Sequence, residues 1–99
     1  MSADERAGSE QGGIAHRVAQ RGANKRKSVA GAATIDAQGL VEFGCECTRI
    51  DCDLLVRMPP DVYRRMVEAD QYVLRPGHHA FATYRTIISV GLMRIEERA

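Results

Sequence analysis

Hydrophobic and polar positions divide the chain into a sparsely apolar first part and a regularly patterned second part. From Leu40 onward, short apolar runs alternate with turn residues, whereas residues 1–39 contain few large apolar side chains. Apolar runs of this length, separated by Gly, Pro and Asp, are typical of short strands and helices in a small domain. The pattern therefore predicts a structured domain at 40–99, preceded by a flexible basic arm and linker at 1–39.

Several segments of the second part have the composition of short strands. Leu40–Phe43 leads into a cysteine-rich stretch and Leu54–Met58 follows it, so these two segments are expected to pair as the arms of a hairpin. Tyr72–Leu74 is a third strand candidate, which the turn residues Pro76 and Gly77 would end. Residues 86–95 are expected to add one further strand or a hairpin.

One short helix is predicted between the hairpin and the third strand. Pro59 and Pro60 pre-set the first helical turn, and Asp61 complements the positive end of the helix dipole. Apolar residues then fall on one face of this helix, namely Val62, Tyr63, Met66 and Val67. The chain is therefore expected to be a small α+β domain with one short helix.

The first part of the chain has weaker signals. Residues 1–13 are small and polar, which predicts a disordered tail. Residues 14–27 could form a weak basic helix, although a glycine and an asparagine lower its helix propensity. Residues 28–39 are rich in Ala, Gly, Ser and Thr and are expected to be a linker, with a turn at Asp36–Gly39. The arm is therefore predicted to be disordered or weakly helical.

Size and charge narrow the class of protein without indicating its function. The chain has 99 residues and a net charge of +1, so it is one domain at most and has no strong overall attraction to polyanions. No apolar run is long enough to span a bilayer, and the first residues lack the pattern of a secretory signal. A cytoplasmic location is the default expectation, with no membrane partner.

The strongest chemical signal is a group of three cysteines within eight residues, at Cys45, Cys47 and Cys52. In a reducing compartment, clustered cysteines are more often metal ligands than disulfides, and an odd number would leave a disulfide framework unbalanced. Three thiolates and one imidazole make a complete tetrahedral ligand set for Zn²⁺. The sequence therefore predicts a structural zinc site whose loop forms the tip of the hairpin.

The fourth ligand is expected to be a histidine from outside the cysteine loop. His78 is the best candidate, because the turn at Pro76 and Gly77 can direct it toward the loop. His79 is the immediate alternative, and His16 is remote in the sequence. Ligation by His78 would close the segment between Cys52 and the turn, and it would complete a small zinc-stapled domain.

Other chemistries remain open for the three cysteines. They could be buried thiols, a redox-active C-x-C pair, or ligands of an iron–sulfur cluster or copper, although the polar residues around them disfavour simple burial. If His78 were not a ligand, three thiolates and a water could form a catalytic zinc site with Glu46 as the base. The chain has no Gly-rich phosphate loop and no Ser/His/Asp set, so no small-molecule substrate is indicated.

The segment from Phe43 to Ile95 resembles a group of small, uncharacterised actinobacterial proteins and appended domains. The resemblance rests on Phe43 before Cys-Glu-Cys, a further cysteine, a tyrosine in the short helix, and the series Tyr-Val-Leu-Arg-Pro-Gly-His that ends at His78. It implies that His78, rather than His79, is the matching histidine. The group often has an acidic residue where this chain has His79, and it implies no particular activity.

Residues 14–30 carry five basic side chains and no acidic one. Such an arm could contact the phosphates of DNA or RNA, or it could be a solvated tail. The stretch contains no aromatic residue, which makes base stacking on it improbable. The candidate phosphate-binding residues are Arg17, Arg21, Lys25, Arg26 and Lys27.

The function predicted from the sequence is a non-enzymatic binding or adaptor module with a structural Cys3His zinc site. Its expected partner is a protein of unspecified identity. The alternatives are a nucleic-acid-binding regulator that uses the arm at 14–30 and a thiol-based redox sensor. A zinc hydrolase is a further alternative, which would need an open coordination position.

Overall fold

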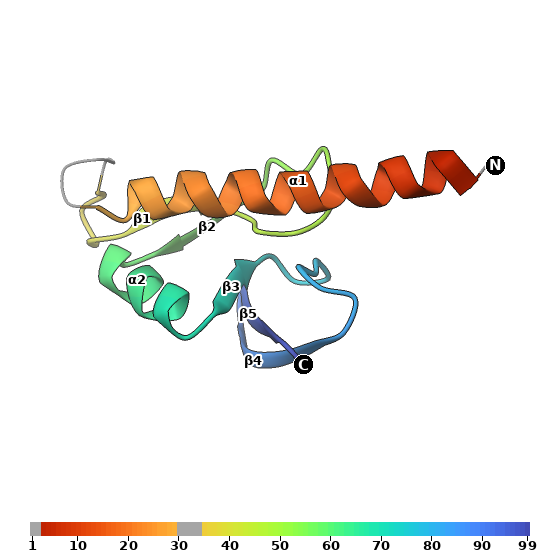
Figure 1. Cartoon of the computed structure of the whole chain (residues 1–99). Helices are drawn as coiled ribbons and strands as arrows, with labels where there is room; N and C mark the ends of the chain where they lie inside the picture. The colour runs from red at the N-terminus through yellow and green to blue at the C-terminus, as the bar shows by residue number, and fades with distance from the viewer. Residues whose placement is uncertain (1–2, 30–34) are drawn as a thin grey trace.

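The computed structural model describes residues 3–29 and 35–99, and it describes the side chains from Gly12 onward within those ranges. The fold is α+β, with two helices and five strands in two small antiparallel sheets (Figure 1). The elements are α1 (Ala3–Lys27), β1 (Val41–Gly44), β2 (Leu55–Met58), α2 (Pro60–Glu68), β3 (Gln71–Leu74), β4 (Tyr84–Val90) and β5 (Met93–Arg98).

The predicted hairpin is present, and its two strands are β1 and β2. They pair antiparallel, with Val41 opposite Met58 and Phe43 opposite Val56. These four side chains are buried, because alternate residues of a strand lie on one face and this face is the apolar one. The cysteine loop lies between the two strands, as the sequence predicted.

Helix α2 covers the buried face of the hairpin. Pro59 and Pro60 stand at its start, where a missing backbone N–H is not needed by the helix. Tyr63 and Met66 are its buried residues, and the Tyr63 ring stacks on Phe43 with 4.4 Å between ring centres. The predicted helix is therefore confirmed, and its amphipathic face forms part of the core.

The second sheet has the strand order β3-β5-β4. Val73 of β3 lies opposite Ile95 of β5, and both belong to the same core as Phe43 and Tyr63. Strand β4 is an edge strand whose seven residues are all exposed, and the register shifts at Ile87 between Thr86 and Ile88. The C-terminal hairpin that the sequence allowed is present as β4 and β5.

Helix α1 is longer than the predicted weak helix, and it packs along β1 and the cysteine loop (Figure 1). It begins at Ala3, so it includes most of the segment expected to be a disordered tail. Two glycines permit the close approach: a Cβ on Gly13 would meet the Thr48 carbonyl, and one on Gly44 would meet the Gln20 side chain. Of the two predictions for the arm, disordered or weakly helical, the structure shows a helix.

Residues of the predicted arm at 1–39 pack against the domain predicted at 40–99. Arg21, Asn24 and Ser28 of the arm are buried against residues of the second part. The arm looked solvated because these residues are polar, but the fold supplies each with hydrogen-bond partners. Of the predicted linker, residues 30–34 lie outside the described part of the chain, and the turn at Asp36–Gly39 is present. In the described ranges, no helix has the length and apolar character needed to cross a bilayer.

Candidate metal centre

Four side chains from separate parts of the chain converge beside the hairpin. Cys45 and Cys47 follow β1, Cys52 precedes β2, and His78 stands in the turn after β3. The three sulfurs and the histidine nitrogen all lie within 4.8 Å of one another. The Nδ1 atom of His78 is 3.4 Å from Cys47 Sγ, 3.5 Å from Cys52 Sγ and 3.6 Å from Cys45 Sγ. We call this group the Cys3His cluster.

Backbone hydrogen bonds fix the shape of the cysteine loop. Cys45 N–H donates to Leu54 O at 3.0 Å, which closes the loop at the end of the hairpin. The Glu46 and Thr48 amides donate to Val73 O and His79 O, at 2.9 Å and 3.1 Å, so the loop runs alongside the second sheet. Because these bonds join the loop to both sides of His78, they hold the cysteines and the histidine together.

The turn that carries His78 has the geometry expected from Pro76 and Gly77. Gly77 has a φ of 82°, a conformation that favours glycine, and His78 N–H donates to Arg75 O at 3.1 Å. The structure brings His78 to the cysteines, and it places the neighbouring His79 against Glu96 and Tyr84 instead. Of the two candidate histidines, only His78 is positioned as a ligand.

In the absence of an ion, the surroundings favour the protonated form of the Cys45 and Cys47 thiols. Burial raises the pKa of the Cys45 and Cys47 thiols, and the nearby Cys52 raises it further. Burial, followed by the charges of Arg49 and Arg75, lowers the pKa of His78, so its imidazole is kept neutral and able to donate a lone pair. A metal ion bound by the cysteines would displace thiol protons, because metal ions bind the deprotonated sulfur. The donor set therefore fits a tetrahedral metal ion.

His16 of α1 takes a part that the sequence did not predict. Its Nδ1 lies 2.9 Å from Cys47 O, and its Nε2 lies 3.0 Å from Cys52 O. The ring therefore joins the two ends of the cysteine loop through backbone carbonyls and supplies no ligand to the cluster. No spacing rule could have identified it, because the pairing depends on how α1 lies over the loop.

Glu46, the residue between the first two cysteines, is fully buried. Its carboxylate accepts hydrogen bonds from the side chains of Arg21, Asn24 and Tyr63, at 3.0, 3.1 and 2.5 Å, and from Val73 N–H at 2.9 Å. Burial and the Glu46 charge together raise the pKa of Tyr63, so the phenol stays protonated and donates. We call this arrangement the Glu46 centre. These hydrogen bonds occupy both oxygens of the Glu46 carboxylate, which the zinc-hydrolase alternative would need as a free base.

Asn24 also completes the edge of β1. Its side-chain amide donates to Gly44 O and accepts from Gly44 N–H, each at 2.8 Å. The side chain thereby takes the place that a neighbouring strand would occupy. In the sequence, Asn24 only lowered the helix propensity of residues 14–27. Its role at the edge of β1 could not be predicted, because the partner Gly44 is 20 residues away and the pairing leaves no local pattern.

A second buried carboxylate, Glu96 of β5, holds the segment that follows His78. One oxygen accepts from Ala80 N–H at 2.8 Å and Phe81 N–H at 3.1 Å. The other lies 2.5 Å from the Arg94 guanidinium and 3.1 Å from His79 Nδ1. Arg94 also donates to His78 O. We call this arrangement the Glu96 centre, and it fixes the backbone next to the proposed ligand.

The predicted phosphate-binding residues do not form one exposed patch. Arg21 is 7% exposed and bonded to Glu46, and Arg17 donates to Ala80 O at 2.6 Å. Lys27 donates to Glu42 O, whereas Lys25 and Arg26 are exposed in the last turn of α1. Nucleic-acid binding through these residues stays a prediction.

Comparison with known proteins gives no further assignment. No protein-family model, no curated protein and no solved structure matches the chain. The resemblance to the actinobacterial group therefore rests on its sequence motif alone. Among the residues of that motif, His78 belongs to the Cys3His cluster, Glu46 and Tyr63 belong to the Glu46 centre, and Phe43 packs in the same core as Tyr63.

Proposed function

We propose that the protein is a non-enzymatic binding module whose fold depends on one structural zinc ion. The observation that carries the proposal is the convergence of three sulfurs and one imidazole nitrogen within 4.8 Å of one another. Thiolates and imidazole suit zinc, and four protein ligands complete its tetrahedral coordination. A site filled by four protein ligands has no open position for substrate water, which favours a structural role over catalysis.

The position of the Cys3His cluster supports the same role. It joins the loop of the β1–β2 hairpin to the turn after β3, so one ion would connect the two sheets. A domain of this size has a small core, and structural zinc supplies about 10–16 kcal/mol of apparent binding free energy. The buried thiols argue against the redox alternative, because raised pKa values lower the reactive thiolate fraction when no metal is bound.

The experiment that tests this proposal is metal analysis of protein purified without a metal-binding tag. We expect one zinc per chain, and we expect chelation to cause loss of the folded circular dichroism signal. His78→Ala should weaken metal binding strongly, and His79→Ala is the matched control that should retain it. Folded, reduced protein that contains no metal would overturn the proposal.

A further inference from the structure

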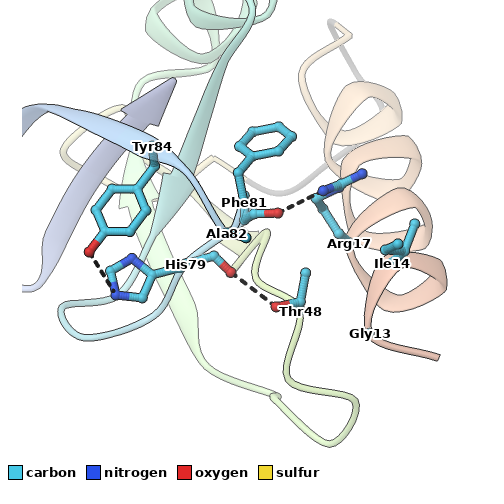
Figure 2. Close-up of a pocket in the computed structure, with 9 residues that line it drawn as sticks. Gly13, Ile14, Arg17, Thr48, His79, Phe81, Ala82 and Tyr84 are labelled. Carbon is cyan, nitrogen blue, oxygen red and sulfur yellow. Dashed lines mark hydrogen bonds between the residues drawn. The ribbon is translucent and has the colours of Figure 1, made fainter. Parts of the chain in front are cut away.

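A cleft opens between α1 and the segment 79–84, next to the Cys3His cluster but separate from it (Figure 2). Its volume is about 720 Å³, which is within the range of ligand-binding pockets. Gly13, Ile14 and Arg17 line the α1 side, and Thr48 lines the floor. The opposite wall consists of His79, Ala80, Phe81, Ala82 and Tyr84.

The charge of the cleft is positive. None of its nine lining residues is acidic, and Arg17 extends from α1 toward the opposite wall (Figure 2). The Arg17 and Arg98 guanidinium carbons lie 4.6 Å and 4.7 Å from the centre of the same Phe81 ring. Among the side chains that the structure describes, neither arginine forms an ion pair. An anion beside Phe81 would be attracted to both guanidinium groups.

The nearby carboxylate does not neutralise this charge. Glu96 lies behind the wall formed by Ala80 and Phe81, and it is fully buried. Its oxygens are occupied by two backbone amides, Arg94 and His79. An anion from outside the protein would therefore meet no competing carboxylate at Arg17 among the described side chains.

Each aromatic ring of the cleft already has a ring or a guanidinium group packed against it. The Phe81 ring contacts the two guanidinium groups, and it meets Tyr72 edge-on at 4.9 Å. Tyr84 stacks on His79 at 4.1 Å, and Arg94 lies 5.2 Å from its ring centre. Because single-stranded nucleic acids bind by stacking bases on open aromatic faces, this arrangement favours a carboxylate ligand over a nucleotide.

The cleft also offers apolar surface next to its positive charge. Ile14 is 48% exposed and Tyr84 is 39% exposed, and Ala82 is exposed as well. An aliphatic or aromatic side chain of a ligand would remove these groups from water, while a neighbouring carboxylate pairs with the Arg17 guanidinium. The ligand chemistry that fits is thus an anion adjacent to an apolar group.

We propose that this cleft binds an acidic peptide segment of a partner protein, with a carboxylate on Arg17 and an adjacent apolar side chain on Ile14 and Ala82. The inference rests on the proposed function as a binding module, and it names the site and the chemistry of the partner. Arg17 donates one hydrogen bond to Ala80 O, but its charge has no ion-pair partner among the described side chains. An ordinary exposed helix surface would not combine such a guanidinium with a hollow of this volume and no acidic lining residue.

The test is a titration of the metal-loaded full chain, labelled with ¹⁵N, with two synthetic peptides followed by NMR. The acidic probe is acetyl-Glu-Phe-Glu-Leu-Asp-amide, and the control has Gln and Asn in place of its acidic residues. We expect saturable shifts of the Gly13, Thr48 and Ala82 amides with the acidic peptide only. Ala82→Glu should weaken binding about tenfold or more by charge repulsion, whereas Ala82→Gln should not.

A second pair of variants tests the cation itself. Arg17→Gln should weaken binding about tenfold or more, and Arg26→Gln, an exposed arginine of the same helix, should leave it unchanged. Equal shifts with both peptides, shifts outside the cleft, or saturation of the cleft by an oligothymidine instead of the peptide would overturn the proposal. Metal content is measured on the same sample, so the two proposals can fail separately. Folded, zinc-bound protein that does not bind the acidic peptide would refute the peptide site alone. Folded protein without metal would refute the zinc site.

Discussion

The Glu46 centre and the Glu96 centre bury a carboxylate on either side of the Cys3His cluster, but they connect different parts of the fold. Glu46 accepts from α1, α2 and β3, which are far apart in the sequence. Glu96 accepts from the short segment 79–81 and from Arg94, two residues away on its own strand. The Glu46 centre therefore holds the tertiary structure together, whereas the Glu96 centre shapes one loop.

Both centres are attached directly to the cluster. Glu46 lies between Cys45 and Cys47, and the Glu96 centre holds the backbone at and after His78 through Arg94. Residues next to a metal ligand commonly fix the orientation of that ligand. Both centres consist of a buried carboxylate whose oxygens accept hydrogen bonds. At Glu46 this arrangement connects distant parts of the fold, whereas at Glu96 it positions the backbone next to His78.

Loss of the metal should have the largest effect, because it removes the link between the two centres. Metal release leaves thiols that bind protons, so the metal-bound state holds fewer protons and affinity for the ion rises with pH. Burial raises the pKa of Cys45 and Cys47 above 9.0, whereas that of His78 is lowered below 6.5. We expect acidification to release the ion with uptake of more than one proton.

The measurement is the intensity of the thiolate-to-metal absorption band of the Co²⁺-substituted protein as the pH is lowered. His79→Ala is the control, and its release curve should coincide with that of the unaltered chain. Release with uptake of a single proton and a midpoint at the ordinary histidine pKa would show that His78 alone governs metal retention, contrary to this expectation.

Glu46→Gln should be the most destabilising substitution at either centre. It leaves the Arg21 guanidinium, which is 7% exposed, without its charge partner. Breaking a buried ion pair costs about 3–5 kcal/mol. Chemical denaturation of the metal-loaded protein measures the loss, with Glu42→Gln on exposed β1 surface as the control. A loss no larger than that of the control would remove the tertiary role assigned to Glu46.

Glu96→Gln should cost less in stability and more in metal affinity. Glu96→Gln also breaks a buried ion pair, with Arg94. Arg94 keeps two hydrogen-bond acceptors, Thr86 Oγ1 at 2.8 Å and His78 O, whereas Arg21 keeps only Gln71 O, so the loss should be at the lower end for a broken buried pair, about 3 kcal/mol. The loosened segment should reduce metal affinity about tenfold, which competition with a chromophoric chelator measures. Glu97→Gln is the matched control. Unchanged affinity would mean that the Glu96 centre does not position His78.

Tyr63→Phe is the smallest change and the sharpest probe of the Glu46 centre. It keeps the ring that stacks on Phe43 and removes one donor of the four. The expected cost is about 1–2 kcal/mol in the free energy of unfolding, and Tyr84→Phe on the exposed strand serves as the control. If the two variants were equally stable, the Tyr63 hydroxyl would contribute nothing to the centre.

The convergence of the Cys3His cluster could be predicted from the sequence because its signals are local. Cys45, Cys47 and Cys52 are close in the chain, and a Pro-Gly turn precedes His78. The hairpin, α2 and β3 could be predicted for the same reason, since alternating burial and proline positions are visible within a few residues. The choice of His78 over His79 also agrees with the observed geometry.

The packing of α1 could not be predicted, because its buried residues are polar. Arg21 and Asn24 look like solvated helix positions until Glu46 and Gly44 are placed beside them. Glu96 stands in a run of charged residues that reads as exposed strand, although it is fully buried. A polar residue can be buried only when hydrogen-bond partners are available to it. When those partners are distant in the chain, a single sequence does not distinguish such a residue from a surface residue.

The irregularity at Ile87 has a consequence for how copies of the protein behave in solution. Strand β4 exposes Ile87, Ile88 and Val90 along an unpaired sheet edge, a combination that invites edge-to-edge association between chains. A bulge bends such an edge and breaks the regular spacing of its free amides and carbonyls. The extra residue therefore opposes edge-to-edge association along a strand whose seven residues are all exposed.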